Sequence, residues 1–169
     1  MKESVIMPNE NNSSELTNEL IYRKYLMNSE QRRQFFRELT MPEYIAMHII
    51  AETASKETIY SGRTYLKDIS DKMQISIRQT SKIVANLRDR GLVQWAHDGN
   101  GADGTYVIIT DSGTKLMEKQ ETMLKDYYGR VIDKFGIKKM IQLLQMMKEL
   151  ETVMSTELEE TEEMTDANE

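Results

Sequence analysis

The sequence contains no cysteine and only two prolines, and none of its apolar runs approaches the about 20 residues that a membrane-spanning helix needs. Without cysteine the chain cannot form disulfides, thiolate zinc sites or cysteine redox sensors. The first 15 residues hold no apolar core of signal-peptide length and predict no export signal. We therefore expect a globular cytoplasmic protein.

Catalytic motifs are also missing. The sequence has no nucleophile elbow, phosphate-binding loop, HExxH motif or paired cysteine and histidine spacing. The two histidines, His48 and His97, fall in an apolar helix pattern and in a strand pattern, where structural roles are commoner than metal ligation. We therefore expect no enzyme, no cofactor and no metal site.

Positive charge is scarce overall but is concentrated in one segment. The chain carries a net charge of −6, yet seven acidic residues and no basic one lie beyond residue 156, so the preceding residues carry +1. Within residues 62–90, seven basic side chains outnumber three acidic ones. Because a phosphate backbone meets the local field and not the total charge, this segment is a candidate nucleic-acid interface.

Two short amphipathic helices flank a tight turn within residues 65–93. Their apolar positions recur at helical spacing: Leu66, Ile69 and Met73 in the first helix, then Thr80, Ile83, Val84 and Leu87 in the second. Ser76 stands where an N-cap is needed, and Gly91 where a left-handed C-terminal residue is needed. The pattern predicts a helix-turn-helix.

The outward face of the second helix is polar and carries no acid. The candidate DNA-binding residues are Ser76, Arg78, Gln79, Lys82 and Asn86 in the second helix and its cap, and Arg63, Lys67, Lys72, Arg88 and Arg90 around it. Arginine and lysine suit guanine O6 and N7, and glutamine suits adenine. Asn86 lies farther from the helix N-terminus, so we expect it to contact phosphate. A polar helix face is more often only solvated, so the assignment depends on the residues that come after the helix.

A β-hairpin comes directly after this helix. Strands are predicted at residues 92–97 and 106–110, and the loop between them reads DGNGADG, which is typical of a hairpin loop. Residues 63–65 predict a very short third strand. A hairpin after a recognition-type helix is a wing, and the ordered set of helix, turn, helix and wing is far more specific than any one part.

Helical patterns flank this domain on both sides. We predict a mobile terminus at residues 1–13, an N-terminal dimerisation region at 14–39, a winged helix-turn-helix domain at 40–110 and C-terminal dimerisation helices at 111–156. The region 14–39 forms either one long helix or two helices broken near Asn28 and Ser29. A helix after residue 136 carries a long apolar stripe with no internal partner, which predicts an interchain interface: Ile137, Met140, Ile141, Leu144, Met147, Leu150, Met154 and Leu158. Residues 157–169 are expected to form a disordered acidic tail.

Three short motifs carry a family resemblance. They are Leu39-Thr40-x-Pro42, Leu87-x-x-x-Gly91-Leu92-Val93 and Ile109-Thr110-x-x-Gly113. In this order the sequence resembles the MarR (multiple antibiotic resistance regulator) family over roughly residues 15–156. The resemblance implies a mainly α (α+β) fold, a homodimer with interleaved terminal helices, a recognition helix in each major groove and a wing near the minor groove. Many members are repressors released by a small ligand.

The wing departs from the family pattern. Family wings usually carry Asp-x-Arg before the second wing strand. Counting back from Thr110 without gaps places Gly101 and Asp103 at the Asp and Arg positions, and a shift of two residues places Asp103 and Thr105 there. The loop contains no arginine or lysine, and an acidic tip is repelled by the minor groove. We therefore expect DNA binding to depend on the recognition helix and on the cations around it.

The resulting hypothesis is a cytoplasmic, homodimeric transcriptional repressor that binds a pseudo-palindromic sequence of double-stranded DNA. Candidate effector-binding residues are Tyr22, Tyr25, Tyr44 and His48. The alternative is a winged-helix dimer that acts through protein–protein contacts, which the acidic wing and the negative total charge would suit. No membrane partner is expected.

Overall fold

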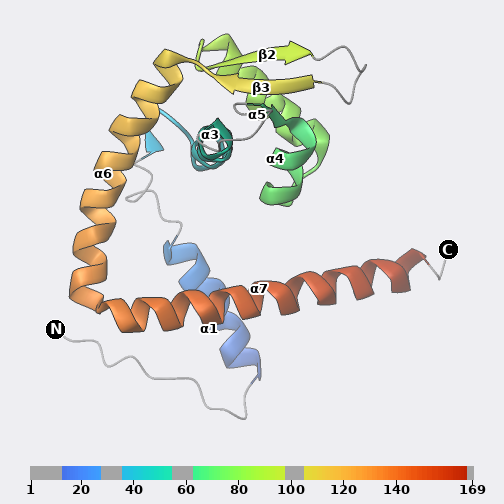
Figure 1. The fold of residues 1–169 in the computed structure, drawn as a ribbon. Coiled ribbons are helices and arrows are strands. Elements are labelled where there is room, and N and C mark those ends of the chain that lie inside the picture. Colours follow the sequence, from blue (N-terminus) through green and yellow to red (C-terminus); the bar gives the residue numbers. More distant parts are fainter. Residues whose placement is uncertain (1–12, 28–35, 55–62, 98–104, 167–169) are drawn as a thin grey trace. The chain divides into compact units, whose positions relative to one another are not determined.

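The computed structural model describes residues 13–27, 36–54, 63–97 and 105–166. Its elements, in chain order, are α1 (Ser13–Met27), α3 (Met41–Ala54), β1 (Thr64–Tyr65), α4 (Leu66–Met73), α5 (Ile77–Asp89), β2 (Val93–His97), β3 (Thr105–Ile109), α6 (Asp111–Phe135) and α7 (Ile137–Asp166) (Figure 1). The chain forms two compact units, residues 1–121 and 122–169. The predicted mainly helical fold with a small sheet is confirmed.

The three strands form one antiparallel sheet in the order β1-β3-β2. Val93 pairs with Ile109 across the hairpin, and Thr64 of β1 pairs with Val107 on the other side of β3. Both wing strands, β2 and β3, begin and end within one residue of their predicted positions. The short strand predicted before the helix-turn-helix is present as β1. The acidic loop at 98–104 lies outside the described residues.

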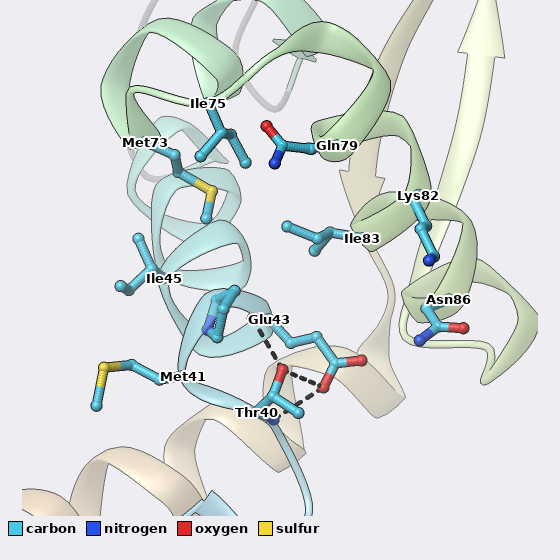
Figure 2. Close-up of a pocket in the computed structure, with 11 residues that line it drawn as sticks. Thr40, Met41, Glu43, Ile45, Met73, Ile75, Gln79, Lys82, Ile83 and Asn86 are labelled. Atoms are coloured by element: carbon cyan, nitrogen blue, oxygen red, sulfur yellow. Dashed lines mark hydrogen bonds between the residues drawn. The ribbon is translucent and has the colours of Figure 1, made fainter. Parts of the chain in front are cut away.

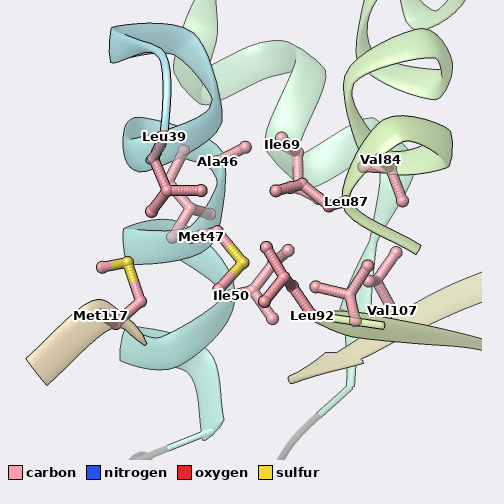
Figure 3. Packing of buried hydrophobic residues seen from close by; sticks show 12 residues of the cluster. Leu39, Ala46, Met47, Ile50, Ile69, Val84, Leu87, Leu92, Val107 and Met117 are labelled. Carbon is pink, nitrogen blue, oxygen red and sulfur yellow. The ribbon is translucent and has the colours of Figure 1, made fainter. Parts of the chain in front are cut away.

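Helix α3 lies at the centre of the winged domain. It packs against α4, α5, β1 and β3. Its buried face, with Met47 and Ile50, meets Ile69 of α4, Leu87 of α5 and Val107 of β3 (Figure 3). Burying these side chains stabilises the domain by roughly 2 kcal/mol each, and it fixes which faces of α4 and α5 remain in solvent.

The N-terminus of α3 is closed by a reciprocal cap. The backbone N–H of Thr40 donates to Glu43 Oε2 at 2.8 Å, and the Thr40 hydroxyl donates to the same oxygen at 2.9 Å. The Glu43 N–H donates back to Thr40 Oγ1 at 3.4 Å. This arrangement satisfies free donors of the first turn and makes Thr40 the N-cap of α3. Pro42 lies in the first turn, where its missing N–H costs nothing.

The C-terminal helices differ from the prediction at their far end. Gly136 has a φ of +99° and separates α6 from α7, in agreement with the helix predicted after residue 136. However, α7 continues to Asp166, so the disordered tail predicted from residue 157 is wrong up to that residue. Glutamate is a good helix former, and adding residues to an existing helix needs no new nucleus, so the acidic segment prolongs α7.

Two further N-terminal expectations lie outside the described residues. These are the mobile terminus, of which residues 1–12 are not described, and the helix break near Asn28 and Ser29. Helix α1 is described as far as Met27. Among the described helices, none is both long and apolar enough to cross a bilayer.

Candidate nucleic-acid interface

The turn between α4 and α5 is fixed by local hydrogen bonds. Gln74 ends α4 in the left-handed region with a φ of 53°. The Ile75 N–H then donates to the Ser70 carbonyl at 3.2 Å, and the Ser70 hydroxyl donates to the Ile75 carbonyl at 2.6 Å. Because Ser70 is itself buried, these bonds hold the turn against α4 and set the direction in which α5 begins.

Helix α5 begins with a capping box. The Gln79 N–H donates to Ser76 Oγ at 3.2 Å, and Gln79 Oε1 accepts from the Ser76 N–H at 3.0 Å. Ser76 is therefore the N-cap of α5, as predicted. Reading adenine, the role that the sequence predicts for Gln79, needs its amide oxygen as an acceptor and its amide nitrogen as a donor. In this structure the oxygen is already occupied by the cap, so Gln79 stabilises the start of α5.

The other end of α5 is closed by a Schellman motif. Gly91 has a φ of +71°, its N–H donates to the Arg88 carbonyl at 2.8 Å, and the Leu92 N–H donates to the Leu87 carbonyl at 3.0 Å. A glycine is needed at this position because a side chain strains a left-handed residue. The predicted left-handed role of Gly91 is confirmed.

The two glycine-containing motifs meet at Leu92. The Thr110 N–H and hydroxyl both donate to the Leu92 carbonyl, at 3.1 Å and 3.0 Å, and Thr110 Oγ1 also caps α6 by accepting from the Gly113 N–H at 3.0 Å. A Cβ on Gly113 would lie only 2.1 Å from the Leu92 oxygen. This close approach explains why threonine and glycine occur at that spacing, and it anchors the wing to the start of α6.

The outward face of α5 carries the candidate reading residues. Thr80, Val84 and Leu87 are fully buried. Arg78, Lys82 and Asn86 point away from this core, and the described part of the chain shows no side-chain hydrogen bond or ion pair for any of them. Their side chains are therefore available to a ligand.

An open groove of about 570 Å³ runs beside this face, between α5, the end of α4 and the start of α3. Figure 2 shows Lys82, Asn86 and Ile83 on the α5 side of the groove, with Met73 across from them on the α4 side.

The surrounding cations fall into two groups. Lys67 is exposed on the first turn of α4, Lys72 lies 3.5 Å from Glu52, and the Arg63 guanidinium lies 4.8 Å from the centre of the Tyr106 ring. These three remain near solvent. Arg88 is half exposed as well and pairs only with its neighbour Asp89, whereas Arg90 contacts residues far from it in the sequence.

Arg90 is the most firmly held of these cations. Its Nη1 lies 3.4 Å from Glu43 Oε1, and its Nη2 donates to the Glu38 carbonyl. Glu43 is buried, so Arg90 connects the end of α5 to the capped start of α3. Arg88 lies 2.7 Å from Asp89 and 5.8 Å from the centre of the Trp95 ring. The sequence predicts a DNA contact for both arginines. It does not predict the contact between Arg90 and Glu43, because no local pattern links residues 47 positions apart.

The effector candidates are only partly brought together. The rings of Tyr44 and His48 stack at 6.3 Å, and His48 Nδ1 lies 3.6 Å from Glu121 Oε1. Burial raises the pKa of Tyr44, and the nearby Glu121 carboxylate raises this pKa further. Tyr22 and Tyr25 lie exposed on α1, and no ring contact joins them to Tyr44 or His48 among the described residues.

The second histidine also has a structural partner. His97 Nδ1 lies 2.9 Å from Thr105 Oγ1 across the wing hairpin. Within the part of the chain that the structure describes, no cluster of three or more His, Cys, Asp or Glu side chains is arranged to hold a metal ion.

Comparison with known proteins identifies the fold. No family model and no curated protein matches the chain. Among solved structures, NadR in complex with 4-hydroxyphenylacetate is 22% identical, with a TM-score of 0.59 over 85% of this chain and 97% of NadR. A MarR family regulator from Neisseria meningitidis is 16% identical, with a TM-score of 0.63 over 87% of this chain and 96% of its own.

BpsR of Bordetella bronchiseptica, whose description concerns the regulation of its DNA binding by 6-hydroxynicotinic acid, is 14% identical, with a TM-score of 0.64 over 80% of this chain and 98% of BpsR. Several other neighbours are described as transcriptional regulators. At these identities the likeness concerns the fold: the chain has the winged helix-turn-helix fold of MarR family regulators.

Proposed function

We propose that this protein is a homodimeric, sequence-specific DNA-binding transcriptional regulator that acts as a repressor. The observation that carries the proposal is the outward face of α5, where Arg78, Lys82 and Asn86 have no side-chain partner among the described residues. The helix behind them is capped at both ends and packed against α3, so these side chains project from a rigid support.

In the proposed complex, α5 lies in the major groove. Arg78, in its first turn, contacts guanine O6 and N7, and Lys82 contacts a guanine or a phosphate one turn later. Asn86 contacts phosphate. Lys67, Arg63 and Lys72 contribute to the positive field that attracts the backbone. Arg90 is excluded from this contact set because its guanidinium group is held by Glu43 and the Glu38 carbonyl. Arg88, half exposed and paired only with the exposed Asp89, remains a candidate for the backbone.

The dimer is formed by the C-terminal helices. Seven large apolar side chains of the α7 stripe are exposed: Ile137, Ile141, Leu144, Met147, Leu150, Met154 and Leu158. An exposed stripe of this length, at three- and four-residue spacing, needs a partner surface in water. A second copy of the chain supplies a matching stripe, and two-fold symmetry then predicts a pseudo-palindromic operator with half-sites about 10 bp apart, centre to centre.

A small effector would act at the stacked pair of Tyr44 and His48. These rings provide a flat surface for an aromatic ligand, and the described residues place the Glu121 carboxylate beside His48. Two of the neighbours are described together with small aromatic acids, which supports this ligand class. We include Tyr22 and Tyr25 only as candidates that lie on α1.

The proposal is tested by affinity selection of the full-length protein against random-sequence duplexes, followed by fluorescence anisotropy in a salt series. Selective binding should weaken with salt at a log–log slope of about −0.9 per neutralised phosphate. Arg78→Ala combined with Lys82→Ala should abolish the selectivity. Lys138→Ala combined with Lys139→Ala removes the same charge from exposed positions on α7 and should leave it unchanged.

If the wild-type protein enriches no sequence even at low salt, the DNA-binding proposal is wrong. The alternative, a winged-helix dimer that acts through protein contacts, would then be favoured, because the cation-free loop at 98–104 and the net charge of −6 suit it better.

A further inference from the structure

The first residue of the recognition helix is an exposed isoleucine. Ile77 has half of its surface (50%) in solvent, and it does not belong to the hydrophobic core. The other β-branched aliphatic residues of α5 behave differently, because Val84 is fully buried and Ile83 packs against the core. Ile77 is therefore apolar at a place where packing within the domain does not require it.

The position of Ile77 suggests what it contacts. It directly precedes Arg78, and it lies one turn before Ser81 and Lys82, at the end of α5 that reaches deepest toward base edges in a helix-turn-helix complex. Polar residues there meet hydrogen-bonding groups or water. An isoleucine gains free energy only by covering apolar surface, and the one apolar group that a base pair presents in the major groove is the C5-methyl of thymine.

We infer that Ile77 reads the methyl group of one thymine in each operator half-site, close to the base pair contacted by Arg78. The inference rests on the proposed function and adds a sequence preference to it. Arg78 and Lys82 select through hydrogen bonds, whereas Ile77 selects through burial of a methyl group. The recognition helix therefore favours a thymine beside the contacted guanine, on whichever strand directs its methyl toward the start of α5.

The test replaces thymines of the selected duplex by deoxyuridine, one symmetric pair at a time. This change removes the methyl and leaves Watson–Crick pairing intact. At one thymine per half-site, wild-type affinity should fall about fourfold for each methyl lost, because burying one methyl-sized group is worth about 0.8 kcal/mol. Substituting both half-sites together should then cost about fifteenfold. The Ile77→Ala variant should bind the thymine and uracil duplexes with equal affinity.

Matched variants separate methyl reading from general damage. Ile77→Val keeps a branched side chain and should retain part of the difference between thymine and uracil. Ile45→Ala removes a comparably exposed isoleucine from α3 and should retain all of it. Thermal melting should show that Ile77→Ala folds as the wild type does, because an exposed side chain contributes little to the core.

Failure of the inference about Ile77 can be distinguished from failure of the proposed function. If the wild type selects a sequence but no thymine shows a penalty that Ile77→Ala removes, the inference about Ile77 is wrong and the regulator proposal stands. If the wild type selects no sequence, the regulator proposal fails before any deoxyuridine is introduced, and the inference about Ile77 fails with it.

Discussion

Replacing Arg90 by alanine should weaken the fold and leave the electrostatics of DNA binding unchanged. The Arg90 side chain is 39% exposed and its partner Glu43 is 8% exposed, so the pair is neither a surface ion pair nor a fully buried one. Exposed pairs contribute up to about 1 kcal/mol, whereas breaking a buried pair costs about 3–5 kcal/mol.

The structure indicates that the loss of Arg90 costs less than breaking a fully buried ion pair. After the substitution, Glu43 still accepts two hydrogen bonds from Thr40, so its carboxylate is not left without partners. Solvent also screens the exposed arginine. We therefore expect Arg90→Ala to lower the free energy of unfolding by about 1–2 kcal/mol. Arg88→Ala is the matched control, because its partner Asp89 is itself 65% exposed, and it should cost about 0.5 kcal/mol or less.

Urea unfolding measures the stability change, and anisotropy in a salt series measures the DNA contact. Arg90→Ala should keep the wild-type salt slope, since the side chain touches no phosphate in our proposal. A slope that becomes shallower by about 0.9, with unchanged stability, would refute the reasoning and return Arg90 to the DNA-contacting residues. A double-mutant cycle with Glu43→Gln then reports how strongly the two side chains are coupled.

Three further predictions rest on the geometry of other sites. Leu144→Glu should weaken the proposed dimer in sedimentation velocity, while Lys139→Glu should not. Gly113→Ala should cost about 2 kcal/mol of stability through its backbone clash, whereas Gly129→Ala, which meets nothing within 4 Å, should stabilise α6 by about 0.5–1 kcal/mol in thermal unfolding. The Tyr44 pKa is raised above 10.0, so Tyr44 favours folding while protonated and this contribution is lost as the pH rises through its folded-state pKa. In an ultraviolet phenolate titration, the difference between wild type and Tyr44→Phe should therefore appear above pH 10; a difference centred below that pH would contradict the assignment.

The elements that the sequence predicted well are those fixed by neighbours in the chain. The cap at Ser76, the left-handed Gly91 and the helix start after residue 136 each depend on a few adjacent residues, and each was found where it was expected. The hairpin strands were also placed to within one residue, because their apolar runs and the glycine-rich loop between them are local signals.

The acidic end of α7 shows where local reasoning was too coarse. Glutamate-rich composition and high charge favour disorder, although the same residues have good helix propensity. Composition describes what a segment does in isolation. Residues 157–166 are not isolated, since they continue a helix whose nucleus lies many residues earlier.

The assignment of cations to DNA was limited for a different reason. Counting charges between residues 62 and 90 located the basic segment, but it could not show which side chains are free. That depends on contacts between residues far apart in sequence, such as Arg90 with Glu43, which no periodicity reveals. Once those contacts are known, the basic segment divides into a reading face around Arg78 and Lys82 and an internal tether at Arg90. Alanine substitution in the reading face should change DNA binding in the salt titration, whereas substitution of Arg90 should not. One experiment can therefore test the division.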